Sequence, residues 1–153
     1  IYSSDLLRAK QTAEIIAREH NLPVTVMPEL REINFGIWEG KTYKEIKELY
    51  PEMLNIWLSK PQDLKIPEGE TFPEMLARAW QGLKKILSKH KDETIIVVAH
   101  GGTIAVLLCN ILEISLNNLW KIKQGNTGIT IVEFAEDKGV LTLFNDTYHL
   151  HIS

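Results

Sequence analysis

Apolar residues at helical spacing predict amphipathic helices in three parts of the chain. The first helix follows Ser4, which we expect to be its N-cap, and its apolar face runs from position 6 to position 17. The second covers 42–50 and is extended by a helical segment over 51–58. The third covers 71–87. The second and third both begin with a threonine followed three residues later by a glutamate, which is the spacing of a capping box.

Apolar runs without a helical period predict strands between these helices. The segment 94–99 is apolar without alternation, as expected of a buried parallel strand, and a buried helix follows it over about 103–112. A short strand is expected within 21–27, and a hairpin is expected from 128–134 and 140–144. Strands that alternate with helices predict an α/β domain built in layers.

Composition narrows the class of protein. The 153 residues are 44% hydrophobic and 24% charged, so we expect residues 1–153 to form a single domain with its own core. A net charge of −3 argues against a nucleic-acid partner. No apolar run reaches the ~18 residues of a membrane span. The only cysteine, Cys109, lies in an apolar segment, which fits a cytoplasmic protein without an internal disulfide.

His100 is the first candidate for chemistry. It directly follows the strand predicted over 94–99, and Gly101 and Gly102 come next. Ligands of open α/β sheets bind at the carboxyl ends of the strands, and the free N–H groups at a helix N-terminus attract an anion. His100 and the N–H of Gly101 are therefore candidates for binding phosphate. The alternative is a histidine satisfied by a nearby carbonyl, with glycines that serve only a tight turn.

Arg8 is the second candidate. It lies in the first turn of its predicted helix, where a cation opposes the helix dipole unless an anion shares the site. A guanidinium can bind phosphate through two parallel hydrogen bonds. The alternative, which the local spacing favours, is a surface ion pair with Asp5, three residues earlier.

Glu32 is the third candidate. It lies in the segment 28–40, which has no regular period and which we expect to be a loop. Aromatic residues follow it in that loop, and an apolar environment would raise the pKa of the carboxyl group toward the range useful for a general acid. Glu29 and Glu39 compete for this role. The alternative interpretation of each of the three acids is a charged side chain that is solvated on the loop and has no catalytic role.

Four segments of the chain occur in the order and spacing of the histidine phosphatase superfamily, the phosphoglycerate-mutase-like enzymes. They are SSDLLRAKQTAEII, LREINFGIWEG, PEGETFPEMLARAW and IIVVAHGGTIAVLL. The chain resembles that family over nearly its whole length. Its ending, WKIKQGNTGITIVEF with LFNDTYHL, looks most like the α-ribazole phosphatases of cobalamin synthesis. The resemblance implies a three-layer sandwich around a mostly parallel central sheet.

The resemblance also implies a phosphohistidine mechanism without metal or cofactor. A histidine attacks the phosphorus of a small-molecule phosphate monoester, and water then hydrolyses the phosphoenzyme. In that scheme Arg8 holds the phosphoryl oxygens, His100 donates to them, and the N–H of Gly101 completes the cradle. Glu32 protonates the leaving group and then assists the attacking water.

The family's attacking histidine belongs to an Arg-His-Gly motif on its first strand, and these 153 residues do not contain that motif. We therefore expect a domain truncated at its N-terminus. It would lack its first strand, its nucleophile and a second phosphate-binding arginine, which together need on the order of 30–50 upstream residues. The chain by itself is expected to show no turnover. The other histidines are found near helix ends or in the tail: His20, His90, His149 and His151.

Two other functions fit parts of this pattern. A phosphoglycerate-type mutase would return the phosphoryl group to a sugar acid, but the compact segment between Glu32 and His100 favours a phosphatase. A non-catalytic phosphate-binding module is the alternative from another class, and the missing nucleophile supports it. Oligomeric state stays open, a homodimer included.

Overall fold

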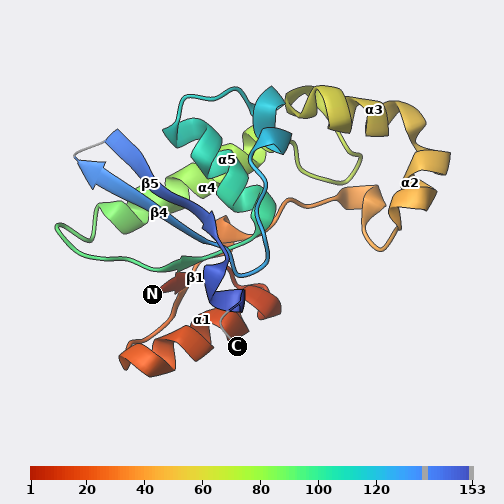
Figure 1. Ribbon diagram of the computed structural model, residues 1–153. Helices are drawn as coiled ribbons and strands as arrows, with labels where there is room; N and C mark the ends of the chain where they lie inside the picture. Colours follow the sequence, from red (N-terminus) through yellow and green to blue (C-terminus); the bar gives the residue numbers. More distant parts are fainter. Residues whose placement is uncertain (136–137, 152–153) are drawn as a thin grey trace.

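Three short parallel strands form the centre of the fold, in the order β2–β1–β3 (Figure 1). They are β1 (Tyr2–Ser3), β2 (Thr25–Val26) and β3 (Val97–Val98). Ser3 lies beside Val26 on one side and Val98 on the other. This computed structural model describes residues 1–135 and 138–151.

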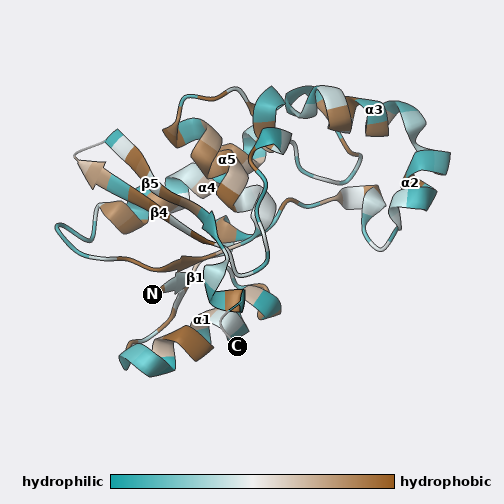
Figure 2. Ribbon diagram, viewed as in Figure 1, coloured by the Kyte–Doolittle hydropathy of each residue, from teal (hydrophilic) through white to brown (hydrophobic). Residues whose placement is uncertain are grey.

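Helices cover both faces of this sheet. On one face lies α1 (Leu7–His20), which buries Ala9, Ala13 and Ala17. On the other lies α4 (Phe72–Leu87), whose Ile86 packs with Tyr2 and Leu30, and α5 (Gly101–Ile111) lies beside it (Figure 1). Figure 2 shows hydrophobic residues along much of α5. The expected α/β class and its three layers are confirmed.

The predicted hairpin is formed by β4 (Ile129–Ala135) and β5 (Lys138–Asp146). Residues 136 and 137, between the two strands in the sequence, lie outside the described residues. One face of the hairpin packs on α4 and α5, where Phe134 meets a cluster that includes Leu107. Within the described residues the hairpin is a sheet of its own, with no hydrogen bonds to β2–β1–β3. The expected lack of a first strand stays a prediction.

A helical lobe extends from this core (Figure 1). It contains α2 (Tyr43–Leu49) and α3 (Pro51–Ser59). Both predicted capping boxes are confirmed, one at Thr42 ahead of α2 and one at Thr71 ahead of α4. The lobe joins the core through an aromatic cluster around Trp57, whose ring centroid lies 4.4 Å from that of Trp120. The remaining short elements are 3-10 helices: η1 (Pro28–Leu30), η2 (Gly36–Trp38), η3 (Pro61–Asp63), η4 (Leu116–Lys121) and η5 (Tyr148–His151).

Some expectations about these elements are wrong. Ser4 is not the N-cap of α1, because the helix begins at Leu7 and the cap position is Leu6, with no side-chain cap bond. The segment 94–99 contributes only two strand residues, which are half-buried, and within the described residues β3 has a strand on one edge only.

No helix of the described residues is long and apolar enough to span a membrane.

Candidate active site

The site lies where β1 and β3 end. The two strands are parallel, with Ser3 beside Val98, so Ser4 after β1 and His100, two residues after β3, meet at one edge of the sheet. The Nε2 atom of His100 and the Oγ of Ser4 form a hydrogen bond of 2.9 Å, and Ser4 Oγ also accepts the N–H of Leu6 at 3.2 Å. His100 is 6% exposed and immediately precedes α5. The predicted position of His100 at the carboxyl edge is confirmed.

His100 is neutral at pH 7. Its pKa is lowered from 6.5 to about 4, first by burial and then by the positive charges of Arg8 and Arg78, while the negative charge of Asp5 opposes the shift. A neutral imidazole carries one N–H, so His100 has both a donor and an acceptor nitrogen at the site. The same positive surroundings favour an anion beside it.

Glu32 reaches the same place from the loop between η1 and η2. Its Oε1 accepts the N–H of Ile33 at 3.0 Å, and its Oε2 accepts the N–H of Gly102 at 3.1 Å. A Cβ on Gly102 would lie 2.4 Å from Glu32 Oε1, so this position needs glycine if the carboxylate is to stay there. The hydroxyl of Thr103 donates to the carbonyl of Arg31 at 2.8 Å and ties the same loop to α5.

The competing acids have other partners. Glu29 accepts a hydrogen bond of 2.7 Å from Lys85, which holds the pKa of Glu29 below its usual range. Glu39 accepts the N–H of Phe35 at 3.0 Å. The aromatic residues of the loop gather around Trp57 instead of the Glu32 carboxylate, whose oxygens bind amide groups.

Arg8 is exposed at the start of α1, close enough to His100 to influence its pKa. The ion pair proposed for it with Asp5 is wrong, because Asp5 pairs with Arg31. The Nε of Arg31 lies 2.6 Å from Asp5 Oδ1, and its Nη2 contacts the other carboxylate oxygen. These bonds hold the pKa of Asp5 below its usual range. Among the described residues no ion pair includes Arg8, so its charge is available to a ligand.

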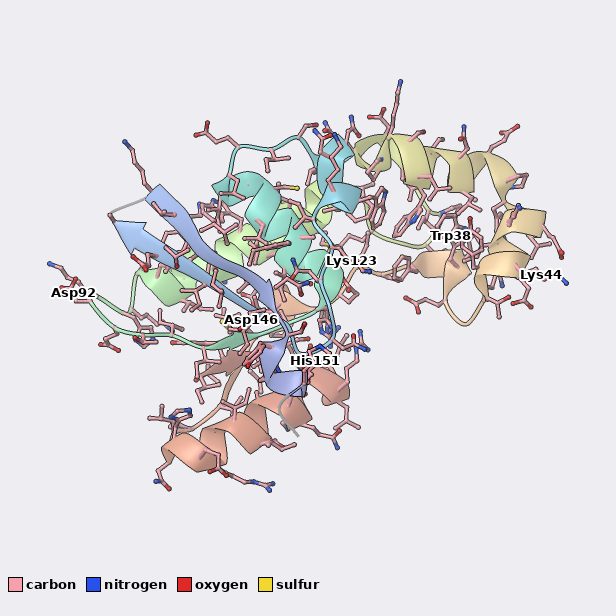
Figure 3. The ribbon with its side chains drawn as sticks, viewed as in Figure 1. Trp38, Lys44, Asp92, Lys123, Asp146 and His151 are labelled. Carbon is pink, nitrogen blue, oxygen red and sulfur yellow. The ribbon has the colours of Figure 1, made fainter. Side chains whose placement is uncertain are left out.

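A cavity of about 310 Å³ opens at the N-terminus of α5. Its walls are mainly apolar, and Lys123 is the charged side chain of its lining (Figure 3). Gly101 borders it, whereas Arg8, Glu32 and His100 are not among its lining residues. The lining residues are Gly101, Gly102, Ala105, Leu119, Trp120, Ile122, Lys123 and Gln124.

Three residues near the site were not predicted from the sequence. Ser4 was interpreted as a helix cap, but it is the hydrogen-bond partner of His100. Arg78 and Glu70 form a bidentate ion pair beside the Glu32 loop. Both lie in the segment PEGETFPEMLARAW, so the family resemblance was the one signal that pointed to them.

Comparisons with known proteins agree with this fold. Residues 1–147 match the model of the histidine phosphatase superfamily, branch 1. The metal-independent phosphoserine phosphatase of Arabidopsis thaliana is 35% identical over 98% of this chain and 62% of its own length. Phosphoserine phosphatase 1 of Hydrogenobacter thermophilus is 30% identical over 98% of this chain and 71% of its own length.

Solved structures show the same fold. YhfR of Bacillus stearothermophilus superposes with a TM-score of 0.93 at 30% identity, over 97% of this chain and 74% of that one. The α-ribazole phosphatase of Shigella flexneri gives a TM-score of 0.82 at 22% identity, over 95% of this chain and 72% of that one, and shares the fold.

The structure thus defines the class of protein: a three-layer α/β protein with a histidine at the carboxyl edge of its sheet. The chain belongs to the histidine phosphatase superfamily. It is an enzyme of the histidine phosphatase type.

Proposed function

We propose that this enzyme hydrolyses small-molecule phosphate monoesters without a metal, through a phosphohistidine intermediate. The observation that carries the proposal is the buried, neutral His100 at the start of α5, with the Glu32 carboxylate on the neighbouring amide of Gly102. Donors and an acid are therefore within reach of one anion-binding position.

The residues take these roles. Arg8 and the N–H of Gly101 hold the phosphoryl oxygens, and His100 donates to them as negative charge builds in the transition state. Glu32 gives its proton to the leaving alkoxide and then takes one from the attacking water. The attacking histidine is the one that the family resemblance assigns to a segment ahead of Ile1.

L-Phosphoserine is the first substrate to test. Relatives that are 30% and 35% identical to this chain are named phosphoserine phosphatases. The ammonium of Lys123 on the cavity wall suits the carboxylate of such a substrate. α-Ribazole phosphate is the second candidate, since Trp120 and the apolar walls of the cavity suit a planar aromatic group.

The lone, buried Cys109 supports a cytoplasmic location.

Hydrolysis of p-nitrophenyl phosphate by the full-length gene product, with EDTA present, tests the reaction. The proposal expects turnover that survives chelation, is lost by orders of magnitude in His100→Ala, and leaves a phosphohistidine that acid destroys and base preserves. L-Phosphoserine and α-ribazole phosphate are then compared by kcat/KM. Phosphate or vanadate binding without turnover would instead support the binding module. Transfer of the phosphoryl group to a second phosphoglycerate hydroxyl in place of water would support the mutase.

A further inference from the structure

Arg78, in the middle of α4, uses every N–H of its guanidinium group. Two of them bind the carboxylate of Glu70, with Nε 2.6 Å from Oε1 and Nη2 2.7 Å from Oε2. The other three donate to backbone carbonyls of one loop: Nη1 to Glu29 at 2.8 Å and to Arg31 at 2.8 Å, and Nη2 to Glu32 at 3.1 Å. The side chains of Arg78 and Glu70 are only 24% and 17% exposed.

These bonds hold the part of the loop that carries the candidate acid. The carbonyls of Arg31 and Glu32 are gripped on the α4 side, while the Glu32 carboxylate reaches across to the N–H of Gly102 on α5. The loop has no strand or long helix of its own around Glu32, so hydrogen bonds to neighbouring elements fix its path. Bonds from a charged donor are about twice as strong as neutral ones.

We propose that Arg78, itself held by Glu70, is a positioning residue that sets where the Glu32 carboxylate stands at the phosphate site. This inference rests on the proposed function, because it takes Glu32 as the general acid. Arg78 acts through the main chain of the loop and donates to no atom of the Glu32 carboxylate among the described contacts. Its planar fork matters because lysine, with a single rotatable ammonium, cannot hold Glu70 and three carbonyls together.

A displaced Glu32 carboxylate should affect some substrates more than others, according to how much the leaving group needs a proton. A general acid works only within hydrogen-bond reach of the leaving oxygen, and a misplacement of about 1 Å can cost ~100-fold in rate. Alkyl phosphates need that proton because an alkoxide is a poor leaving group, whereas p-nitrophenolate leaves without it. Loosening the loop should therefore slow alkyl phosphates and spare p-nitrophenyl phosphate.

The test compares Arg78→Lys and Glu70→Gln with a matched control in the full-length enzyme. Lys85→Met is that control, because it removes an ion pair between the same helix and the same loop but touches no loop carbonyl. For Arg78→Lys, we expect kcat on glycerol phosphate to fall about 10- to 100-fold and kcat on p-nitrophenyl phosphate to change less than about threefold. Glu70→Gln should act in the same direction, and Lys85→Met should leave the ratio of the two rates unchanged.

Hydrogen exchange gives a readout that needs no turnover. The amide of Gly102 should lose protection in Arg78→Lys and keep it in Lys85→Met, because its acceptor is the Glu32 carboxylate. Equal slowing of both substrates, or an unchanged Gly102 amide, would overturn the inference and leave Arg78 as a structural residue. The Glu32→Gln variant distinguishes a failure of the acid role of Glu32 from a failure of the positioning role of Arg78. If that variant itself slows both substrates equally, the acid role in the proposed function fails, and the inference built on it fails with it.

Discussion

His100 should resist protonation down to unusually low pH. Its pKa is lowered from 6.5 to about 4, chiefly by burial and then by the positive charge of Arg8. The gap between those values is worth at most about 3 kcal/mol, less whatever solvent at the sheet edge screens. Below pH 6.5 the unfolded chain takes up a proton that the folded chain refuses. Folding stability therefore falls as the pH drops from 6.5, and this loss is complete below about 4.

Histidine NMR measures this directly, with the resonance assigned by its loss in His100→Gln. We expect His100 to titrate near pH 4 and the midpoint to rise in Arg8→Gln, because a like charge is removed. Inorganic phosphate should also raise it, since an anion favours the imidazolium. Lys44→Gln is the control: Lys44 lies at the outer end of the helical lobe, far from β1 (Figure 3).

Two results would refute this reasoning. A midpoint near 6.5 in the free protein would mean that burial and the neighbouring arginines do not act on His100 as described. An equal rise in Arg8→Gln and Lys44→Gln would mean that total charge controls the titration and that Arg8 has no special proximity to His100.

Three further changes test other parts of the structure. Arg8→Ala should weaken competitive inhibition by phosphate about tenfold or more, as expected of a charged hydrogen-bond donor, and unchanged inhibition would exclude Arg8 as a phosphate ligand. Gly102→Ala puts a Cβ 2.4 Å from Glu32 Oε1, so the carboxylate should move and kcat on alkyl phosphates fall about tenfold or more, with little change in Tm. A kcat of the Gly102→Ala variant on alkyl phosphates equal to that of the unchanged enzyme would contradict the tight contact between position 102 and Glu32. Thr71→Ala removes the capping box of α4 and should lower the free energy of unfolding by about 1 kcal/mol in a denaturant titration. An unchanged midpoint would show that the box adds nothing.

Local pattern was enough to predict much of the fold. The capping boxes at Thr42 and Thr71 depend on residues three positions apart, so the sequence displays both partners. The same holds for His100 and its glycines, because the strand, His100 and the helix that begins at Gly101 lie close together in the sequence. Burial of 94–99 was harder to predict, since it depends on which strands flank β3 and not on the segment's own residues.

Contacts between distant segments explain what the sequence missed. Ser4 reads as a helix cap because serine favours that position, but its hydroxyl is used by His100, 96 residues away. Arg78 has main-chain acceptors 46, 47 and 49 residues away, and a carbonyl acceptor has no residue type that could reveal it. The predicted pair of Arg8 with Asp5 failed for a related reason: Arg31, from a loop 26 residues away, occupies that carboxylate with two bonds.

The arrangement of charge around the site explains which arginine a phosphate should meet. Three arginines contribute to this region, and carboxylates neutralise two of them, Arg31 through Asp5 and Arg78 through Glu70. Both Arg8 and Arg78 lower the pKa of His100, but within the described part of the chain Arg8 has no carboxylate partner, so its charge is the one that attracts an anion. A bound phosphate would offset that charge and raise the pKa of the imidazole.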